Sequence, residues 1–181
     1  MKITVVGTVY VGLVTVALFA KLGNKVWGLD VDKLKIKNLK LGNIPFFEPG
    51  LKELVSQGIK NKKLEFTNDY KRAVPQSEIV FICVGTPPRA NGDYNLSYVF
   101  AAAAAIAKVL KKYTLIVIKS TVPPGTGEKV KEIIKNITSV SFDIASCPEF
   151  LREGSAVWDS LHPSRIVIGT ETKKARDLLL N

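Results

Sequence analysis

The chain has 181 residues, of which 26 are Lys or Arg and 16 are Asp or Glu, so its formal net charge is +10. At roughly 100–200 residues per domain this length predicts one domain, and a 46% hydrophobic fraction with 23% charged residues excludes a disordered or fibrous chain. The basic residues are mostly Lys and are scattered along the chain, whereas a nucleic-acid surface usually clusters its charge and relies on Arg. We therefore expect a solvated Lys-rich surface and no nucleic-acid partner, with an anionic partner as the alternative.

In chain order, short β-branched runs alternate with longer helical stretches. Strands are expected at residues 3–6, 25–29, 64–66, 79–84, 115–118, 142–145 and 165–168. Helices are expected at residues 11–22, 33–41, 50–59, 97–112, 127–135 and, amphipathic, from 171 to 180. Strands separated by helices imply right-handed crossovers and a parallel sheet covered on both faces. The pattern predicts an α/β fold with a doubly wound, Rossmann-like sheet of six or more strands.

The residues from 3 to 20 carry no charge and follow Lys2, as in a signal peptide or a marginal membrane span. Gly7 and Gly12 interrupt this stretch, and no small-residue cleavage site follows it. We interpret it as a buried strand and the helix after it, and we expect no association with a membrane.

The cysteine and histidine content argues against metal and disulfide chemistry. The single His162 and the two distant residues Cys83 and Cys147 cannot form a structural zinc site or a disulfide framework. We expect no metal and a reducing, cytoplasmic location. Cys83 lies in an apolar strand and is interpreted as an inert core thiol. Cys147 precedes two carboxylates, and negative charge raises a thiol's pKa and blunts its reactivity.

The first predicted strand runs into a glycine-containing turn, and an acidic residue, Asp30, ends the second strand. In a dinucleotide-binding fold the first glycine permits the tight turn, the last allows close packing of helix on strand, and the N–H groups of the helix face the pyrophosphate. The carboxylate accepts hydrogen bonds from the ribose and repels a 2′-phosphate, which favours NAD over NADP. An ordinary turn with a solvent-facing Asp30 is the alternative. The residues assigned to the cofactor here are Gly7, Val9, Tyr10, Val11, Gly12, Asp30 and Lys33.

One position departs from the dinucleotide pattern. Val9 replaces the middle glycine, whose missing side chain normally lets the backbone approach the pyrophosphate. A second bulky residue, Val16, lies one helical turn beyond Gly12, on the face expected to pack on the sheet. The sequence leaves open whether cofactor binding is weakened or lost.

Four further segments follow predicted strands or enter helices. They span residues 42–51, 83–88, 119–126 and 148–156, and they read GNIPFFEPGL, CVGTPP, KSTVPPGT and PEFLREGSA. Together with the glycine turn, residues 1–170 resemble the N-terminal NAD-binding domain of the UDP-glucose/GDP-mannose 6-dehydrogenase family. The last segment departs once, because the family usually has Asn where this chain has Cys147.

The resemblance implies roles for residues in these segments. NAD would contact Thr86, Pro87, Ser120 and Thr121. Thr121 would hold the attacking water and Glu149 would act as a general acid/base, these two being the catalytic residues. Glu153 would contact the nicotinamide half and the substrate. The implied partner is a nucleotide sugar, with UDP-glucose as the expected one, and the substrate-binding residues are Glu149, Phe150, Leu151, Arg152 and Glu153.

Simpler roles stay open for several of these residues. Glu149 and Glu153 could form a solvated acidic face of a helix, and Thr121 could cap the helix that follows it. Glu48 is interpreted as a cap of the helix after Pro49. Lys119 is interpreted as a surface residue.

The family oxidises the sugar's primary alcohol twice through a thioester on a Cys in a Gly-Gly-x-Cys segment, and this chain has no Gly-Gly pair. We divide the chain into a dinucleotide-binding domain, 1–170, and the start of a helix toward absent domains, 171–181, with Leu178, Leu179 and Leu180 exposed. The 181-residue chain is expected to be catalytically incomplete, and the full-length form a homo-oligomer. A non-catalytic NAD-binding or assembly module is the alternative.

Overall fold

The computed structural model describes residues 1–180, which form a seven-stranded sheet in the order β3-β2-β1-β4-β5-β6-β7. The strands β1 to β6 pair in parallel, and β7 pairs with β6 in the antiparallel direction. Their bounds are β1 (Lys2–Val6), β2 (Lys25–Leu29), β3 (Leu64–Thr67), β4 (Ile79–Ile82), β5 (Thr114–Ile118), β6 (Phe142–Ser146) and β7 (Gly169–Thr170). The predicted doubly wound fold is confirmed.

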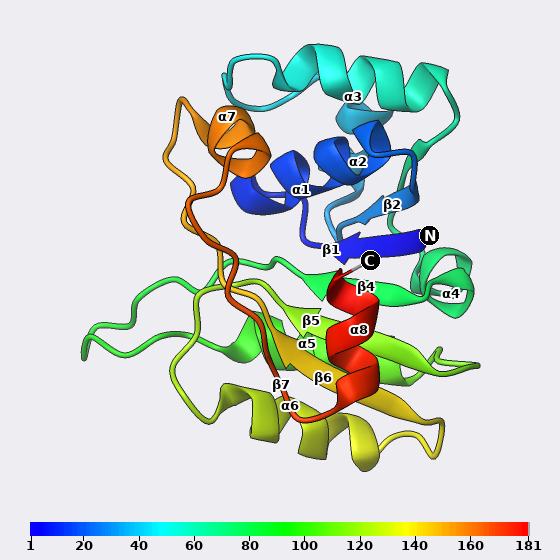
Figure 1. The fold of residues 1–181 in the computed structure, drawn as a ribbon, viewed down its shortest axis with the longest axis vertical. Helices are drawn as coiled ribbons and strands as arrows, with labels where there is room; N and C mark the ends of the chain where they lie inside the picture. Colours follow the sequence, from blue (N-terminus) through cyan, green and yellow to red (C-terminus); the bar gives the residue numbers. More distant parts are fainter. Residues whose placement is uncertain (181) are drawn as a thin grey trace.

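The helices fall into two sets, one for each hydrophobic core. The first core is built with α1 (Tyr10–Lys21), α2 (Lys33–Lys40), α3 (Leu51–Lys60), α7 (Ala156–Leu161) and α8 (Lys173–Leu180). The second core is built with α4 (Tyr70–Ala73), the 3₁₀ helix η1 (Val74–Gln76), α5 (Ser97–Ala107) and α6 (Thr126–Lys135). Figure 1 shows α1 to α3 beside the β1–β2 half of the sheet and α8, in red, beside the other half.

The alternation of side chains along each strand divides the apolar residues between the two cores. In β5, Leu115 and Val117 belong to the first core, whereas Ile116 and Ile118 belong to the second. All five residues of β5 are buried. Such a strand reads as a continuous β-branched run because both of its faces are covered, which is typical of parallel sheets.

The last predicted strand is misplaced. Residues 165–168 belong to no strand, and Ile166 is 69% exposed. The paired residues are Gly169 and Thr170, which lie opposite Ser146 and Ala145 of β6. β-branched residues favour extended backbone, but their presence does not indicate where the edge of a sheet is free to pair with them.

Three further differences concern helices. The short helices α4 and α7 were not predicted, and α5 ends at Ala107, before the predicted end at residue 112. Leu178 and Leu179 are partly buried against the first core rather than exposed, and Leu180 is exposed, as expected. Ala175 of α8 is fully buried in that core. The domain boundary at residue 170 stays a prediction.

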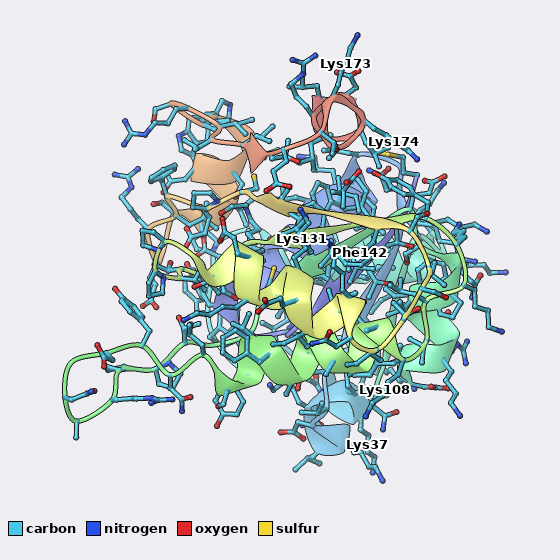
Figure 2. The ribbon with its side chains drawn as sticks, turned by 90° about the horizontal axis from the view of Figure 1, so that it is seen from below. Lys37, Lys108, Lys131, Phe142, Lys173 and Lys174 are labelled. Carbon is cyan, nitrogen blue, oxygen red and sulfur yellow. The ribbon has the colours of Figure 1, made fainter. Side chains whose placement is uncertain are left out.

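Within residues 1–180 no helix is long and apolar enough to cross a membrane. The residues that were compared with a signal peptide form β1, the turn after it and most of α1. The Lys side chains point away from the molecule on several sides, as Lys37, Lys108 and Lys173 do in Figure 2. Their distribution agrees with a solvated surface.

Candidate functional site

The turn between β1 and α1 is too tight for side chains at its glycines. Gly7 has a φ of 95°, and a Cβ there would lie 2.7 Å from the Cys83 carbonyl oxygen. A Cβ at Gly12 would lie 1.8 Å from the Gly7 oxygen. The first turn of α1 contains no acidic residue, and its N–H groups have no partners within the helix. This end of α1 can therefore hold an anionic group such as a pyrophosphate.

Val9 stands at the entrance to this turn. It is the N-cap of α1, its backbone is extended, and its side chain is 50% exposed. The isopropyl group lines a small pocket in front of the helix rather than packing into the core. Val16 is fully buried, on the core-facing side of α1 where the sequence placed it. Val9 therefore faces the space in front of α1, and its effect on cofactor binding stays a prediction.

Asp30 at the end of β2 is 7% exposed, so the solvent-facing alternative is wrong. Its Oδ2 accepts hydrogen bonds from the Thr8 N–H at 2.9 Å and from Lys35 Nζ at 2.8 Å. Its Oδ1 accepts a bond from the Asp32 N–H at 3.1 Å. Burial raises the pKa of this carboxyl, but the bonds from Lys35, Thr8 and Asp32 outweigh burial and hold the pKa below its usual value. Asp30 is therefore a fixed carboxylate beside the turn.

Lys35 is a residue that the sequence analysis missed. Lys33, which we assigned to the cofactor, is exposed on the first turn of α2, and its role there stays a prediction. Positions two apart point in different directions on a helix, and it is Lys35 that reaches Asp30. The spacing of five residues between Asp30 and Lys35 could have predicted this ion pair.

The loops after β4 and β5 are joined by hydrogen bonds. Thr86 Oγ1 donates to the Thr121 carbonyl oxygen at 2.9 Å, and Ser120 Oγ donates to the Val84 carbonyl oxygen at 2.7 Å. Thr121 does not cap a helix, because α6 begins at Thr126 with Gly125 as its N-cap. Its exposed side chain lines the small pocket. The structure thus brings the expected residues Thr86, Ser120 and Thr121 together.

The segment after β6 is a loop and not a helix, so the acidic helix face suggested for Glu149 and Glu153 is wrong. Glu149 accepts a hydrogen bond from the Leu151 N–H within the loop. Arg152 makes two side-chain bonds to Asp159 of α7, at 2.7 and 3.0 Å. The hydrogen bond from Arg152 lowers the pKa of Asp159 to about 2. Arg152 is thereby directed toward α7.

Glu48 has a different role from the predicted helix cap. It is 4% exposed, and α3 has Gly50, not Glu48, as its N-cap. Its carboxylate accepts hydrogen bonds from the Tyr10 hydroxyl, from the Gly154 N–H at 2.8 Å and from the Val157 N–H at 3.3 Å. Burial, followed by the bond to Glu48, raises the pKa of Tyr10 to about 12. Tyr10 therefore stays a neutral hydrogen-bond donor.

Two cavities flank the loop that carries Glu149. The small one, about 180 Å³, lies between the N-terminus of α1 and the loops after β4 and β5. The large one, about 910 Å³, lies between α1, α7, the segment 162–168 and the end of α8. Phe150, Leu151 and Arg152 line the large cavity, and Lys119 and Glu149 line both. Lys119 is half-buried, and its interpretation as a surface residue without a catalytic role stays a prediction.

The two thiols lie in different surroundings. Cys83 is buried beneath the cofactor turn, and burial raises its pKa to about 12. Cys147 is half-buried and lines the large cavity. The interpretation of Cys83 as an inert core thiol agrees with its burial and raised pKa.

The sheet order, the glycine turn and the buried acid after β2 define a dinucleotide-binding domain of the Rossmann type. A glycerol-3-phosphate dehydrogenase from Coxiella burnetii, 12% identical with a TM-score of 0.67, shares this fold. The chain belongs to the UDP-glucose/GDP-mannose dehydrogenase family, and residues 1–181 match that family's NAD-binding domain.

Several members of this family are similar to the chain over nearly its whole length. The chain is 48% identical over 180 residues to the UDP-glucose 6-dehydrogenase TuaD of Bacillus subtilis, covering 98% of this chain and 39% of the relative. The solved UDP-glucose dehydrogenase of Pyrobaculum islandicum is 41% identical with a TM-score of 0.95, over 99% of this chain and 43% of that one. The GDP-mannose dehydrogenase of Pseudomonas aeruginosa is 37% identical with a TM-score of 0.96, over the same shares. The chain thus spans about two fifths of the relatives it matches.

Proposed function

We propose that this chain is the cofactor-binding part of an NAD-dependent nucleotide-sugar 6-dehydrogenase that converts UDP-glucose to UDP-glucuronate. NAD would lie along the turn after β1 and in the small cavity, and the nucleotide sugar would enter the large cavity. The observation that carries the proposal is that Glu149 and Lys119 line both cavities. A reaction between two bound molecules needs such a junction.

The residues of the turn fit NAD. The positive end of α1 suits the pyrophosphate, and the fixed Asp30 carboxylate suits the adenosine ribose. When bound, NAD supplies a hydride acceptor. Val9 is the one departure, because its side chain occupies space that a glycine would leave open. Gly7, Tyr10, Val11, Gly12, Thr86, Pro87, Ser120 and Thr121 would line the rest of the path.

The roles of the loop residues are part of the proposal. Thr121, exposed at the small cavity, would hold a water molecule, and Glu149 would exchange a proton with that water or with the substrate alcohol. The Leu151 N–H fixes the orientation of the Glu149 carboxylate. Phe150, Leu151 and Arg152 would border the nucleotide sugar, and Glu153 would contact both the substrate and the nicotinamide half.

The 181-residue chain alone is expected not to complete this reaction. The second oxidation needs a thiolate that traps the aldehyde as a covalent adduct. The pKa of Cys83, about 12, keeps it a thiol at neutral pH. Cys147 lines the large cavity together with Lys119 and Glu149, and that it does not serve as this nucleophile is part of the proposal.

A chimera tests the proposal. Residues 1–181 would replace the matching part of the Bacillus subtilis relative, and formation of NADH would be measured with UDP-glucose, next to the chain alone. We expect turnover by the chimera and none by the chain, and a loss of about 100-fold or more in the chimera with Glu149→Gln, since general acid–base groups contribute roughly 10²–10⁴-fold. A folded chimera that binds NAD without turnover would favour the non-catalytic module.

A further inference from the structure

A buried carboxylate joins the two halves of the candidate site. Glu48 comes from the loop between α2 and α3, yet its oxygens accept bonds from residues 38, 106 and 109 positions away: Tyr10, Gly154 and Val157. Burying a carboxylate is costly unless hydrogen bonds compensate for lost water. These three donors provide that compensation, and each lies on a different part of the site.

The donors connect the cofactor turn with the loop after β6. Tyr10 is the first residue of α1 and lines the small cavity. Gly154 ends the loop that carries Glu149, and Val157 lies in the first turn of α7. The Tyr10 hydroxyl also accepts a bond from the Gly154 N–H at 3.1 Å. One carboxylate and one phenol therefore hold the loop against the turn.

The loop has few other polar ties to the rest of the molecule. Within residues 1–180, the Tyr10 hydroxyl also donates to the Arg152 carbonyl oxygen at 3.4 Å. The other hydrogen bonds of residues 149–159 are local, such as those from Leu151 to Glu149 and from Arg152 to Asp159. Phe150 and residues 152–154 of the loop are exposed. Without Glu48 the loop would keep its internal turns, and its described hydrogen bonds to α1 would be reduced to those of the Tyr10 hydroxyl with Gly154 and Arg152.

We propose that Glu48 is a positioning residue that couples the cofactor turn to the loop at residues 149–157. A molecule that orders Tyr10 and the N-terminus of α1 also orders the loop, and an ordered loop in turn holds that molecule more tightly, because coupling between two sites is reciprocal. That this coupling also affects binding of a nucleotide sugar rests on the proposed function. The coupling between the cofactor turn and the loop can be measured with NAD alone.

The test uses the 181-residue chain with saturating NAD and three variants. Glu48→Ala removes all three acceptor contacts. Tyr10→Phe removes only the hydroxyl and keeps the ring, whose centroid is 4.9 Å from that of Phe46. Glu53→Ala is the control, because Glu53 is an exposed acid in the first turn of α3. Circular dichroism confirms folding, calorimetry gives the NAD affinity, and hydrogen exchange follows the amides of residues 150–157.

In the parent chain and in Glu53→Ala, we expect NAD to slow exchange in residues 150–157. In Glu48→Ala this slowing is lost and NAD binds about 5- to 20-fold more weakly, within the usual range of coupling between sites. Tyr10→Phe should lose the NAD-dependent slowing as well, because the Tyr10 hydroxyl makes the described hydrogen bonds that join α1 to Glu48 and to the loop. The bonds from Gly154 and Val157 to Glu48 remain in this variant and keep the loop tied to Glu48.

A purely structural role would lower the melting temperature of Glu48→Ala without changing the response of the loop to NAD. A folded Glu48→Ala variant with parental NAD affinity and parental NAD-dependent slowing would overturn the proposal. If Glu48→Ala does not fold, parental behaviour of Tyr10→Phe overturns it instead. No nucleotide sugar enters these measurements, so the outcome does not depend on the chimera experiment.

Discussion

The turn after β1 and the loop after β6 lie in the same candidate site, but they are held in different ways. The turn is fixed by backbone sterics, since a Cβ at Gly12 would lie 1.8 Å from the Gly7 oxygen, and by Asp30 a short distance along the chain. The loop is fixed by Glu48, more than 100 residues away. The turn is therefore a local property of the sequence, whereas the loop depends on the assembled fold.

The largest expected effect comes from a substitution that disrupts the turn after β1. In Gly12→Ala the new methyl group would overlap the Gly7 oxygen, and backbone atoms cannot move aside as a flexible side chain can. We expect a loss of about 3 kcal/mol or more in the free energy of unfolding, at the upper end of overpacking effects. Urea unfolding measures it. Gly127→Ala is the control, because it also lies in a helical first turn but a Cβ there would meet its nearest neighbour at an ordinary 3.9 Å; an equal loss in both variants would contradict the steric account.

The next effect concerns cofactor choice at the turn. Asp30→Asn removes the charge that would repel a 2′-phosphate, and Lys35, no longer paired with a carboxylate, becomes available to that phosphate. Hydrogen bonds to charged groups contribute about 1.5–3 kcal/mol, so we expect the preference for NAD over NADP to fall by about tenfold or more. Calorimetry with both cofactors measures the ratio, and equal affinities in the parent chain would already refute the role of Asp30.

Val9→Gly should increase the affinity of the turn for NAD. The isopropyl group lines the small cavity, and removing it should strengthen NAD binding by about 1–3 kcal/mol, as other reliefs of overpacking do. Glycine is tolerated at helix N-caps, so the melting temperature should change little. Calorimetric titration with NAD decides: unchanged affinity, or low-micromolar binding by the parent chain, would show that Val9 is not an obstacle.

The contrast between turn and loop also separates what the sequence could predict from what it could not. The strands β1 to β6, the turn and Asp30 were predictable, because apolar runs, glycines and an acid at set spacings report local backbone and burial requirements. The partners of Glu48 were not, because a cap for the adjacent helix is the nearest role for an acid and no local pattern points to Gly154. The same limit applies to Ile166, whose β-branched neighbours suggested a strand where no edge was available.

The smallest expected effect concerns the ion pair between Arg152 and Asp159, which is local to the loop. Because Arg152 lowers the pKa of Asp159 from its ordinary 3.8 to about 2, the folded chain binds this proton less readily than the unfolded chain does. The stabilisation from the pair is therefore complete above about pH 4 and is lost as the pH falls toward 2. Both side chains are in contact with solvent, so Asp159→Asn should change the melting temperature at pH 7 only slightly. The sharper readout is the protection of the Arg152 Nε–H from exchange, taken relative to free arginine at the same pH. This protection should be lost in Asp159→Asn and, in the parent chain, only as the pH approaches 2. A parent chain in which this N–H exchanges as fast at pH 7 as in the variant would show that Arg152 is not held by Asp159, and that the loop depends on Glu48 and Tyr10 alone.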